Sequence, residues 1–238
     1  MIMKKNTVII LSAVLPLASL TSTLAQSTWQ TTDALTPWRG RAIAADPTGS
    51  FVSPAIDDGA AGTTGVVSTA VSVSSDKGLT WETVGSIPGY ALKLVTAPEG
   101  TLYASGNRTA TVSGKAFVWL SLDHGMTWAV SDPWSGQTQT NALISMDLAA
   151  APSGAVYLCG YLFAGGKWVV RKGQQTSSGL VWTTVDAFAG SQPNSISVRP
   201  GPAAQPDYRV TAQTSTVLHT FSGSDGDHPG GSLGTAQQ

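Results

Sequence analysis

Two short segments of the sequence place carboxyl and hydroxyl groups at the same spacing. Residues 74–81 read SSDKGLTW, and residues 121–128 read SLDHGMTW. A carboxylate beside hydroxyls can bind a ligand, or it can accept the backbone donors of a tight turn. Five residue types recur at equal offsets: Ser74, Asp76, Gly78, Thr80 and Trp81 correspond to Ser121, Asp123, Gly125, Thr127 and Trp128.

The composition of these segments favours a turn. An Asp side chain accepts hydrogen bonds from N–H groups a few residues further on, and Ser and Thr hydroxyls add local bonds. Gly78 and Gly125 provide the positive φ that such a turn requires. Trp81 and Trp128 begin the next strand and offer a large apolar surface to the sheet. We therefore predict a structural role for both segments.

Other residue types that support chemistry are scattered. Asp225 and Asp227 supply too few oxygens for calcium, which takes roughly six to eight. Cys159 is the only cysteine, so no intramolecular disulfide can form, and its alternating apolar surroundings favour burial. We expect no metal and no cofactor. The three histidines do not pair at the spacing of metal ligands: His124, His219 and His228.

A second pattern recurs with a period of about 50 residues. Each copy is a short apolar strand followed by a turn with Pro and Gly, and a further strand follows the turn. A strand that begins near Trp81, Trp128 or Trp182 completes the unit. Four antiparallel strands at this period are typical of a β-propeller blade. The copies are AIAADPTG (42–49), LKLVTAPEG (92–100), MDLAAAPSG (146–154) and, more loosely, SISVRPG (195–201).

The motif S-x-D-x-G-x-T-W resembles the Asp box, a repeat of sialidases and of other β-propellers. In those proteins it lies at the turn between the last two strands of a blade. The resemblance implies an all-β propeller whose Asp-box residues hold turns. A third copy before Trp182 has lost its Asp but keeps Gly179 and the Trp.

The resemblance to sialidases also implies a site that can be compared residue by residue. That family binds the substrate carboxylate with three arginines, uses a Tyr paired with a Glu as nucleophile, and uses an Asp as acid. The segment WRGRAIAADPTG can be laid over its early arginine motif, which puts Arg39 on the arginine and Arg41 where a proline belongs. The two glutamates, Glu82 and Glu99, fall at repeat positions where exposure is expected, so no Tyr–Glu pair can be nominated.

This comparison favours an exported, non-enzymatic binding scaffold whose ligand is an unknown protein or glycan. The alternative is a degenerate sialidase-like glycosidase or a carbohydrate-binding protein. Arg39, Arg41 and Lys93 are candidates for lining a ligand site on the first strands of the blades. An exposed Trp38 or Trp134 in a loop could stack on a sugar ring. Convergence of several arginines with a carboxylate would favour the enzyme.

The repeats predict about four blades of four strands each. The expected blades are residues 36–85, 86–132, 133–186 and 187–222. The last lacks a fourth strand, and residues 28–35 (TWQTTDAL) resemble one, so we expect the N-terminal strand to complete it and protect its edge. The alternative is that the chain is an incomplete part of a larger propeller.

The N-terminus has the layout of a secretory signal peptide over residues 1–25. Lys4 and Lys5 precede an apolar run over residues 7–20, and a T-L-A ending predicts cleavage near Ala25–Gln26. The run is too short for a membrane span. We expect a secreted or periplasmic protein with no membrane span after cleavage.

The C-terminal end is rich in Gly and Ser. We expect a propeller domain over residues 26–222 and a disordered tail over residues 223–238. Residues 216–231 (TVLHTFSGSDGDHPGG) resemble the opening of the GloVer tandem repeat. That resemblance implies a secreted repeat protein.

Charge excludes several partners. Thirteen basic and 14 acidic residues give a net charge of −1, and only 11% of residues are charged. Such a chain has no electrostatic footprint for nucleic acid or an anionic membrane. We expect a monomer that binds a protein or a glycan.

Overall fold

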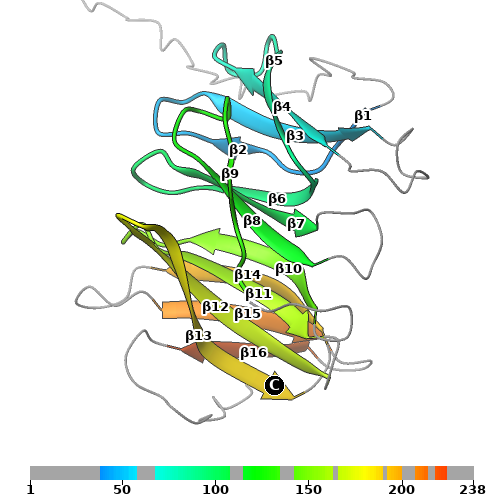
Figure 1. The fold of residues 1–238 in the computed structure, drawn as a ribbon, viewed down its shortest axis with the longest axis vertical. Helices are drawn as coiled ribbons and strands as arrows, with labels where there is room; N and C mark the ends of the chain where they lie inside the picture. Colours follow the sequence, from blue (N-terminus) through cyan, green and yellow to red (C-terminus); the bar gives the residue numbers. More distant parts are fainter. Residues whose placement is uncertain are drawn as a thin grey trace, which may run out of the picture. The chain divides into compact units, whose positions relative to one another are not determined.

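Strands and turns make up the part of the chain that the computed structural model describes (Figure 1). No helix occurs in the described residues, and so none there could span a membrane. The predicted signal peptide, the expected strand at 28–35 and the tail beyond Gly223 lie outside this part. The described residues are 38–57, 68–107, 115–134, 142–162, 166–189, 192–199, 207–213 and 218–223.

The strands form four antiparallel sheets that follow one another along the sequence, and we call these sheets the first to fourth blades. The first blade contains β1 (Trp38–Gly40), β2 (Ala44–Ala45), β3 (Phe51–Asp57), β4 (Thr69–Ser74) and β5 (Glu82–Ile87). The second contains β6 (Tyr90–Thr96), β7 (Leu102–Asn107), β8 (Ala116–Ser121) and β9 (Ala129–Ser131). The third contains β10 (Leu143–Ala150), β11 (Val156–Leu162), β12 (Lys167–Thr176) and β13 (Gly179–Ala189). The fourth contains β14 (Pro193–Arg199), β15 (Asp207–Gln213) and β16 (Leu218–Gly223).

Consecutive strands pair within each blade, which gives an all-β propeller of about four blades, as the repeats predict. In the first blade the first strand is divided into β1 and β2, and both pair with β3. The fourth blade has three strands in the described part of the chain.

The turn between the first two strands of a blade follows directly from the sequence. Ala97 donates its N–H to the Thr101 carbonyl at 2.8 Å, and Gly100 donates to the Ala97 carbonyl at 2.9 Å. Pro98 presets φ for the first corner, and Gly100 has a φ of 93°, a conformation that glycine adopts without a steric penalty. The segments around Gly49 and Gly154 have the same two hydrogen bonds and positive φ.

Apolar side chains of neighbouring blades pack face to face. Val52 and Val71 of the first blade share a fully buried cluster with Trp119 of the second. Each sheet therefore gains its apolar contacts from the next sheet along the chain, as expected of stacked repeats. The cluster between the second and third blades includes Val118 and Leu158. The cluster between the third and fourth blades includes Trp168 and Ile196.

Two glycines permit close approach between the first and second blades. A Cβ at Gly85 would lie 2.5 Å from the Met126 carbonyl oxygen. A Cβ at Gly89 would lie 2.4 Å from the ring of Trp119. Both distances are below any real Cβ contact, so a side chain at either position would push the blades apart.

The first strands of three blades share a β-bulge at the same place. The register shifts between Ala91 and Lys93 in β6 and between Ser145 and Asp147 in β10. A shift between Pro193 and Ser195 interrupts β14 in the same way. Because a bulge redirects the side chain that follows it, Lys93 and Asp147 occupy equivalent positions.

Candidate functional site

The first of the two repeated segments, residues 74–81, uses its polar atoms within its own turn between β4 and β5. Asp76 Oδ1 accepts hydrogen bonds from the Thr80 amide and the Ser74 hydroxyl, both at 2.8 Å. Asp76 Oδ2 accepts the Thr80 hydroxyl at 2.6 Å, and Ser74 Oγ accepts the Gly78 amide at 2.7 Å. The hydroxyl and amide of Thr80 and the hydroxyl of Ser74 lower the pKa of Asp76 to about 2.

The second segment repeats this geometry between β8 and β9. Asp123 accepts the Thr127 amide at 2.9 Å, the Thr127 hydroxyl at 2.5 Å and the Ser121 hydroxyl at 2.7 Å. Burial alone would raise the pKa of Asp123, but the bonds from Thr127 and Ser121 outweigh it and leave the pKa below the ordinary value. Gly125 has a φ of 93°, and its carbonyl accepts the Trp128 indole N–H at 2.9 Å.

The tryptophans that follow the turns are partly buried. Trp128 packs against the cluster between the first and second blades. In the third copy Gly179 keeps a φ of 109°, and Trp182 donates its indole N–H to Ser131 Oγ of the second blade at 2.9 Å. Trp81 is half-buried. The indole of Trp182 therefore links two blades.

Arg41 and Lys93, the two proposed ligand-site residues whose side chains are described, have different surroundings. Arg41 is exposed; its Nη2 donates to the Tyr90 hydroxyl at 2.6 Å, and its guanidinium lies 5.5 Å from the centre of the Tyr90 ring. Within the described residues, no carboxylate pairs with Arg41. Arg39 lies in β1, and its side chain is outside the described part.

Lys93 is neutralised by a residue of the next blade. Its Nζ lies 3.4 Å from Asp147 Oδ1, and Asp147 Oδ2 accepts the Ile196 amide at 3.0 Å. The Asp147 carboxylate therefore joins the first strands of three blades, β6, β10 and β14. Sequence reasoning missed Asp147 and Tyr90, although Asp147 stands in the third repeat at the offset that Lys93 has in the second.

Arg171, on β12, uses its guanidinium for hydrogen bonds within the protein. It donates to the Pro133 carbonyl at 2.8 Å, to the Trp182 carbonyl at 3.2 Å and to the Thr184 hydroxyl. Its guanidinium lies 5.1 Å from the centre of the Trp134 ring, and Trp134 packs against the core between the second and third blades. Arg171 and Arg41 thus share no partner. The side chains of the other arginines are not described: Arg39, Arg108, Arg199 and Arg209.

Glu99 and Tyr103 lie four residues apart in the sequence, on the two sides of a turn in the second blade. Burial and the charge of Glu99 raise the pKa of Tyr103 to about 12. Tyr103 is fully buried, and its hydroxyl has no hydrogen-bond partner among the described residues. A phenol with a raised pKa and no base in contact is a poor nucleophile. Glu82 is exposed at the start of β5.

Asp46 occupies a position in the first turn of its blade where the second and third blades have alanine, Ala97 and Ala151. Its Oδ1 accepts the amides of Thr48 and Ser50 at 2.9 Å each and the Thr48 hydroxyl at 2.6 Å. Burial would raise the pKa of Asp46, but these bonds and the contact with His124 outweigh it and lower the pKa.

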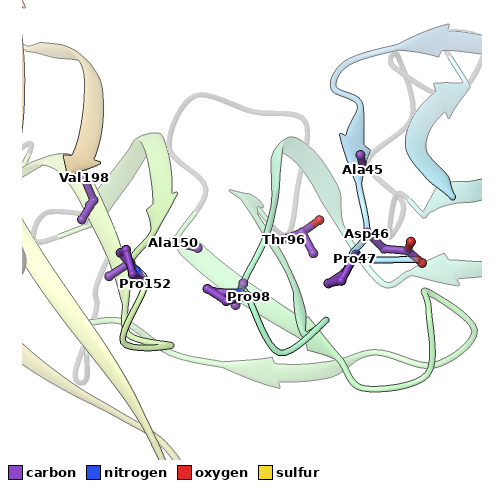
Figure 2. Close-up of a pocket in the computed structure, with 10 residues that line it drawn as sticks. Ala45, Asp46, Pro47, Thr96, Pro98, Ala150, Pro152 and Val198 are labelled. Atoms are coloured by element: carbon purple, nitrogen blue, oxygen red, sulfur yellow. The ribbon is translucent and has the colours of Figure 1, made fainter. Parts of the chain in front are cut away.

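A pocket of about 320 Å³ lies at the end of the first strands, where equivalent turn segments of successive blades come together (Figure 2). Residues 45–47, 96–98 and 150–152 line it, each with a proline, and Val198 lines it from the fourth blade. In Figure 2 the carboxylate of Asp46 points away from Pro98 and Pro152. The lining therefore combines prolyl rings and small apolar side chains with polar groups of the turns.

Comparison with known proteins supports the fold. The chain is similar to a Hadza microbial sialidase, with 17% identity and a TM-score of 0.53 over 77% of this chain and 42% of that one. It is also similar to an α-L-arabinofuranosidase of Fusarium graminearum, with 16% identity and a TM-score of 0.50 over 80% of this chain and 64% of that one. The chain thus spans less than two thirds of the length of either protein.

No protein-family model matches the sequence, and no curated protein matches it. At these identities the structural similarity establishes the propeller fold and not the activity.

Proposed function

We propose that this chain is an exported, non-enzymatic β-propeller that binds an acidic glycan, with Arg41 as the contact for its carboxylate. The supporting observation is the exposed Arg41 guanidinium, which lies against Tyr90 and has no carboxylate partner within the described residues. A planar guanidinium can bind a carboxylate with two parallel hydrogen bonds. The tyrosine ring adjoining it offers an apolar face to a sugar.

The other candidate cation is less available. Lys93 already forms an ion pair with Asp147, so an incoming carboxylate would have to compete with a residue of the protein. Arg41 would meet no such competition from the described residues. We therefore place the anionic group of the ligand at Arg41 and not at Lys93.

The fold supports a sugar as the ligand. The positions of the glutamates support a protein that does not cleave it. Two proteins of similar fold are named as a sialidase and an arabinofuranosidase, so both act on sugars. Glu82 and Glu99 are exposed and belong to different blades, and Tyr103, whose pKa the Glu99 charge helps to raise, is fully buried. Glycoside hydrolysis usually needs two carboxyl groups that flank the same bond. Export is supported by the layout of residues 1–25.

The test compares two ligands with the same sugar chain, one with free carboxylates and one with these groups esterified and uncharged. Oligogalacturonate and its methyl ester are titrated into the mature chain by calorimetry. We expect binding of the acid form only, and about a tenfold or greater loss in the Arg41→Ala variant, because a hydrogen bond to a charged group is worth about 1.5–3 kcal/mol. Raising the salt concentration should weaken binding.

Lys115→Ala is the matched control, because Lys115 is an exposed cation just before β8 and distant in sequence from Arg41. It should bind like the parent. Equal binding of acid and ester, or an Arg41→Ala variant that binds like the parent, would refute the role of Arg41. Release of reducing sugar by the parent would refute the non-enzymatic assignment.

A further inference from the structure

We infer that the ion pair between Lys93 and Asp147 is a second subsite of the glycan site, and that it binds the hydroxyl groups of a neutral sugar. This inference rests on the proposed function, because the acidic sugar occupies Arg41 and Tyr90 and the neutral sugar is linked to it. The ligand class is therefore a glycan in which an uncharged sugar adjoins an acidic one.

A β-bulge places Tyr90 and Lys93 on the same face of the second blade. Residues three apart in a regular strand point to opposite faces, but the register of β6 shifts between Ala91 and Lys93. Tyr90 lies opposite Asn107 of β7. Lys93 lies opposite Ser105, two residues away from Asn107 on the same strand. Opposite residues share a face, as do residues two apart, so Tyr90 and Lys93 lie on one side of the sheet.

One disaccharide can reach both positions on β6. A strand rises about 3.3 Å per residue, so the Cα atoms of Tyr90 and Lys93 are at most about 10 Å apart. Each residue also marks a contact with a neighbouring blade. Arg41 of the first blade donates to the Tyr90 hydroxyl at 2.6 Å. Lys93 Nζ lies 3.4 Å from Asp147 Oδ1 of the third blade.

Both members of the ion pair are accessible and keep hydrogen-bonding capacity. The side chain of Lys93 is 43% exposed and that of Asp147 is 16% exposed. Asp147 Oδ2 accepts the Ile196 amide at 3.0 Å, whereas Oδ1 faces Lys93. An ammonium has three donors and a carboxylate oxygen has two lone pairs. Lys93 Nζ and Asp147 Oδ1 can therefore bind a ligand without giving up their contact with each other.

The chemistry of the ion pair selects a hydroxyl group. A hydroxyl both donates and accepts, so it can donate to Asp147 and accept from Lys93 at the same time. A second carboxylate on the ligand would be repelled by Asp147, and an amine would be repelled by Lys93. An uncharged sugar, which carries several hydroxyls, is therefore the group that fits beside the acidic sugar.

The experiment titrates three sugars into the mature chain and follows binding by NMR. The sugars are galacturonic acid, galacturonic acid linked to galactose, and digalacturonic acid with the same linkage. The two disaccharides differ only in the second ring, which carries either a hydroxymethyl group or a carboxylate. The disaccharide with galactose should bind about tenfold more tightly than galacturonic acid, because it adds hydrogen bonds to charged groups. Digalacturonic acid should show no such gain.

Two variants connect this gain to the ion pair. Lys93→Met should remove most of the gain from galactose and leave the binding of galacturonic acid unchanged. Asp147→Asn keeps an acceptor for the Ile196 amide but leaves Lys93 without a counter-ion. In this variant the preference should reverse, so that digalacturonic acid binds more tightly than the disaccharide with galactose. An ion pair with a merely structural role would not change the preference.

Lys115→Met and Asp132→Asn are the matched controls. Lys115 is exposed, and Asp132 is an exposed carboxylate that accepts a backbone amide, that of Trp134, at 2.9 Å. Both variants should bind the three sugars as the parent does.

The results separate the subsite from the proposed function. If galacturonic acid binds through Arg41 but galactose adds no affinity, the subsite is overturned and the proposed function stands. The same holds if Lys93→Met keeps the full gain or Asp147→Asn keeps the parent's preference. If the parent does not bind galacturonic acid in any of the three forms, both are overturned.

Discussion

Asp46 and His124 lie 78 residues apart in the sequence, and their side chains meet with Oδ2 and Nδ1 separated by 3.1 Å. Asp46 belongs to the first turn of the first blade, and His124 belongs to the turn between β8 and β9 of the second. His124 stands where the corresponding segment of the first blade has Lys77, and both residues have positive φ. The contact therefore joins two turns that are each complete by themselves.

Replacement of Asp46 by alanine should lower the free energy of unfolding by roughly 1–3 kcal/mol, because the Thr48 and Ser50 amides lose their acceptor. Asp46→Asn keeps an acceptor oxygen and should cost less. His124→Ala should cost less still, because its side chain is 53% exposed. Urea unfolding measures all three. Equal stability of Asp46→Ala and the parent would show that the buried carboxylate contributes nothing to the free energy of unfolding.

The stability of the chain should fall in acid, partly through Asp76. Its pKa is lowered from 3.8 to about 2 in the folded state, so the folded carboxylate binds a proton less readily than the unfolded one. The stability it contributes is present above pH about 4 and is lost as the pH falls towards 2. Urea unfolding between pH 7 and 2.5 should show a shallower acid slope in Asp76→Asn. Identical slopes would contradict a lowered pKa.

Arg171→Ala should be destabilising by about 2–3 kcal/mol, because it removes the donors to Pro133, Trp182 and Thr184 and uncovers the Trp134 ring. Arg171→Lys should not restore stability, since an ammonium cannot reach several acceptors with one planar group. Chemical unfolding followed by tryptophan fluorescence measures both. A lysine variant as stable as the parent would show that only the charge matters.

Cys159 should not react with a thiol reagent while the chain is folded. Burial raises the pKa of its thiol to about 12, with a smaller contribution from the Asp147 charge, and its side chain is fully buried. The reactive thiolate is therefore scarce at pH 8 as well as inaccessible. Labelling with a disulfide reagent should be complete in urea and negligible without it. Rapid labelling of the native chain would place the thiol at the surface.

Local geometry was predictable because it depends on neighbours in the sequence. The turn around Gly100 needs only a proline, a glycine with positive φ and two nearby backbone bonds. The bonds of Asp76 and Asp123 span at most four residues, so the motif contains all of their partners. A period of about 50 residues then predicts the four sheets.

The candidate site was not predictable to the same degree. Lys93 was a ligand candidate from its place on a first strand, but the sequence does not show that the next blade supplies Asp147 as its counter-ion. The comparison with the sialidase motif puts Arg41 where a proline belongs, and only the packing of two blades brings it to Tyr90, 49 residues further on.

The sequence by itself determined the β class, the repeating unit and the form of its turns, since hydrogen bonds within a few residues and alternating apolar side chains settle these. Only the tertiary structure decided that Lys93 is neutralised, that Arg41 is exposed and where a pocket forms. The reason is that these features join side chains from different blades, and the face that one blade presents to the next depends on the register and bulges of both sheets.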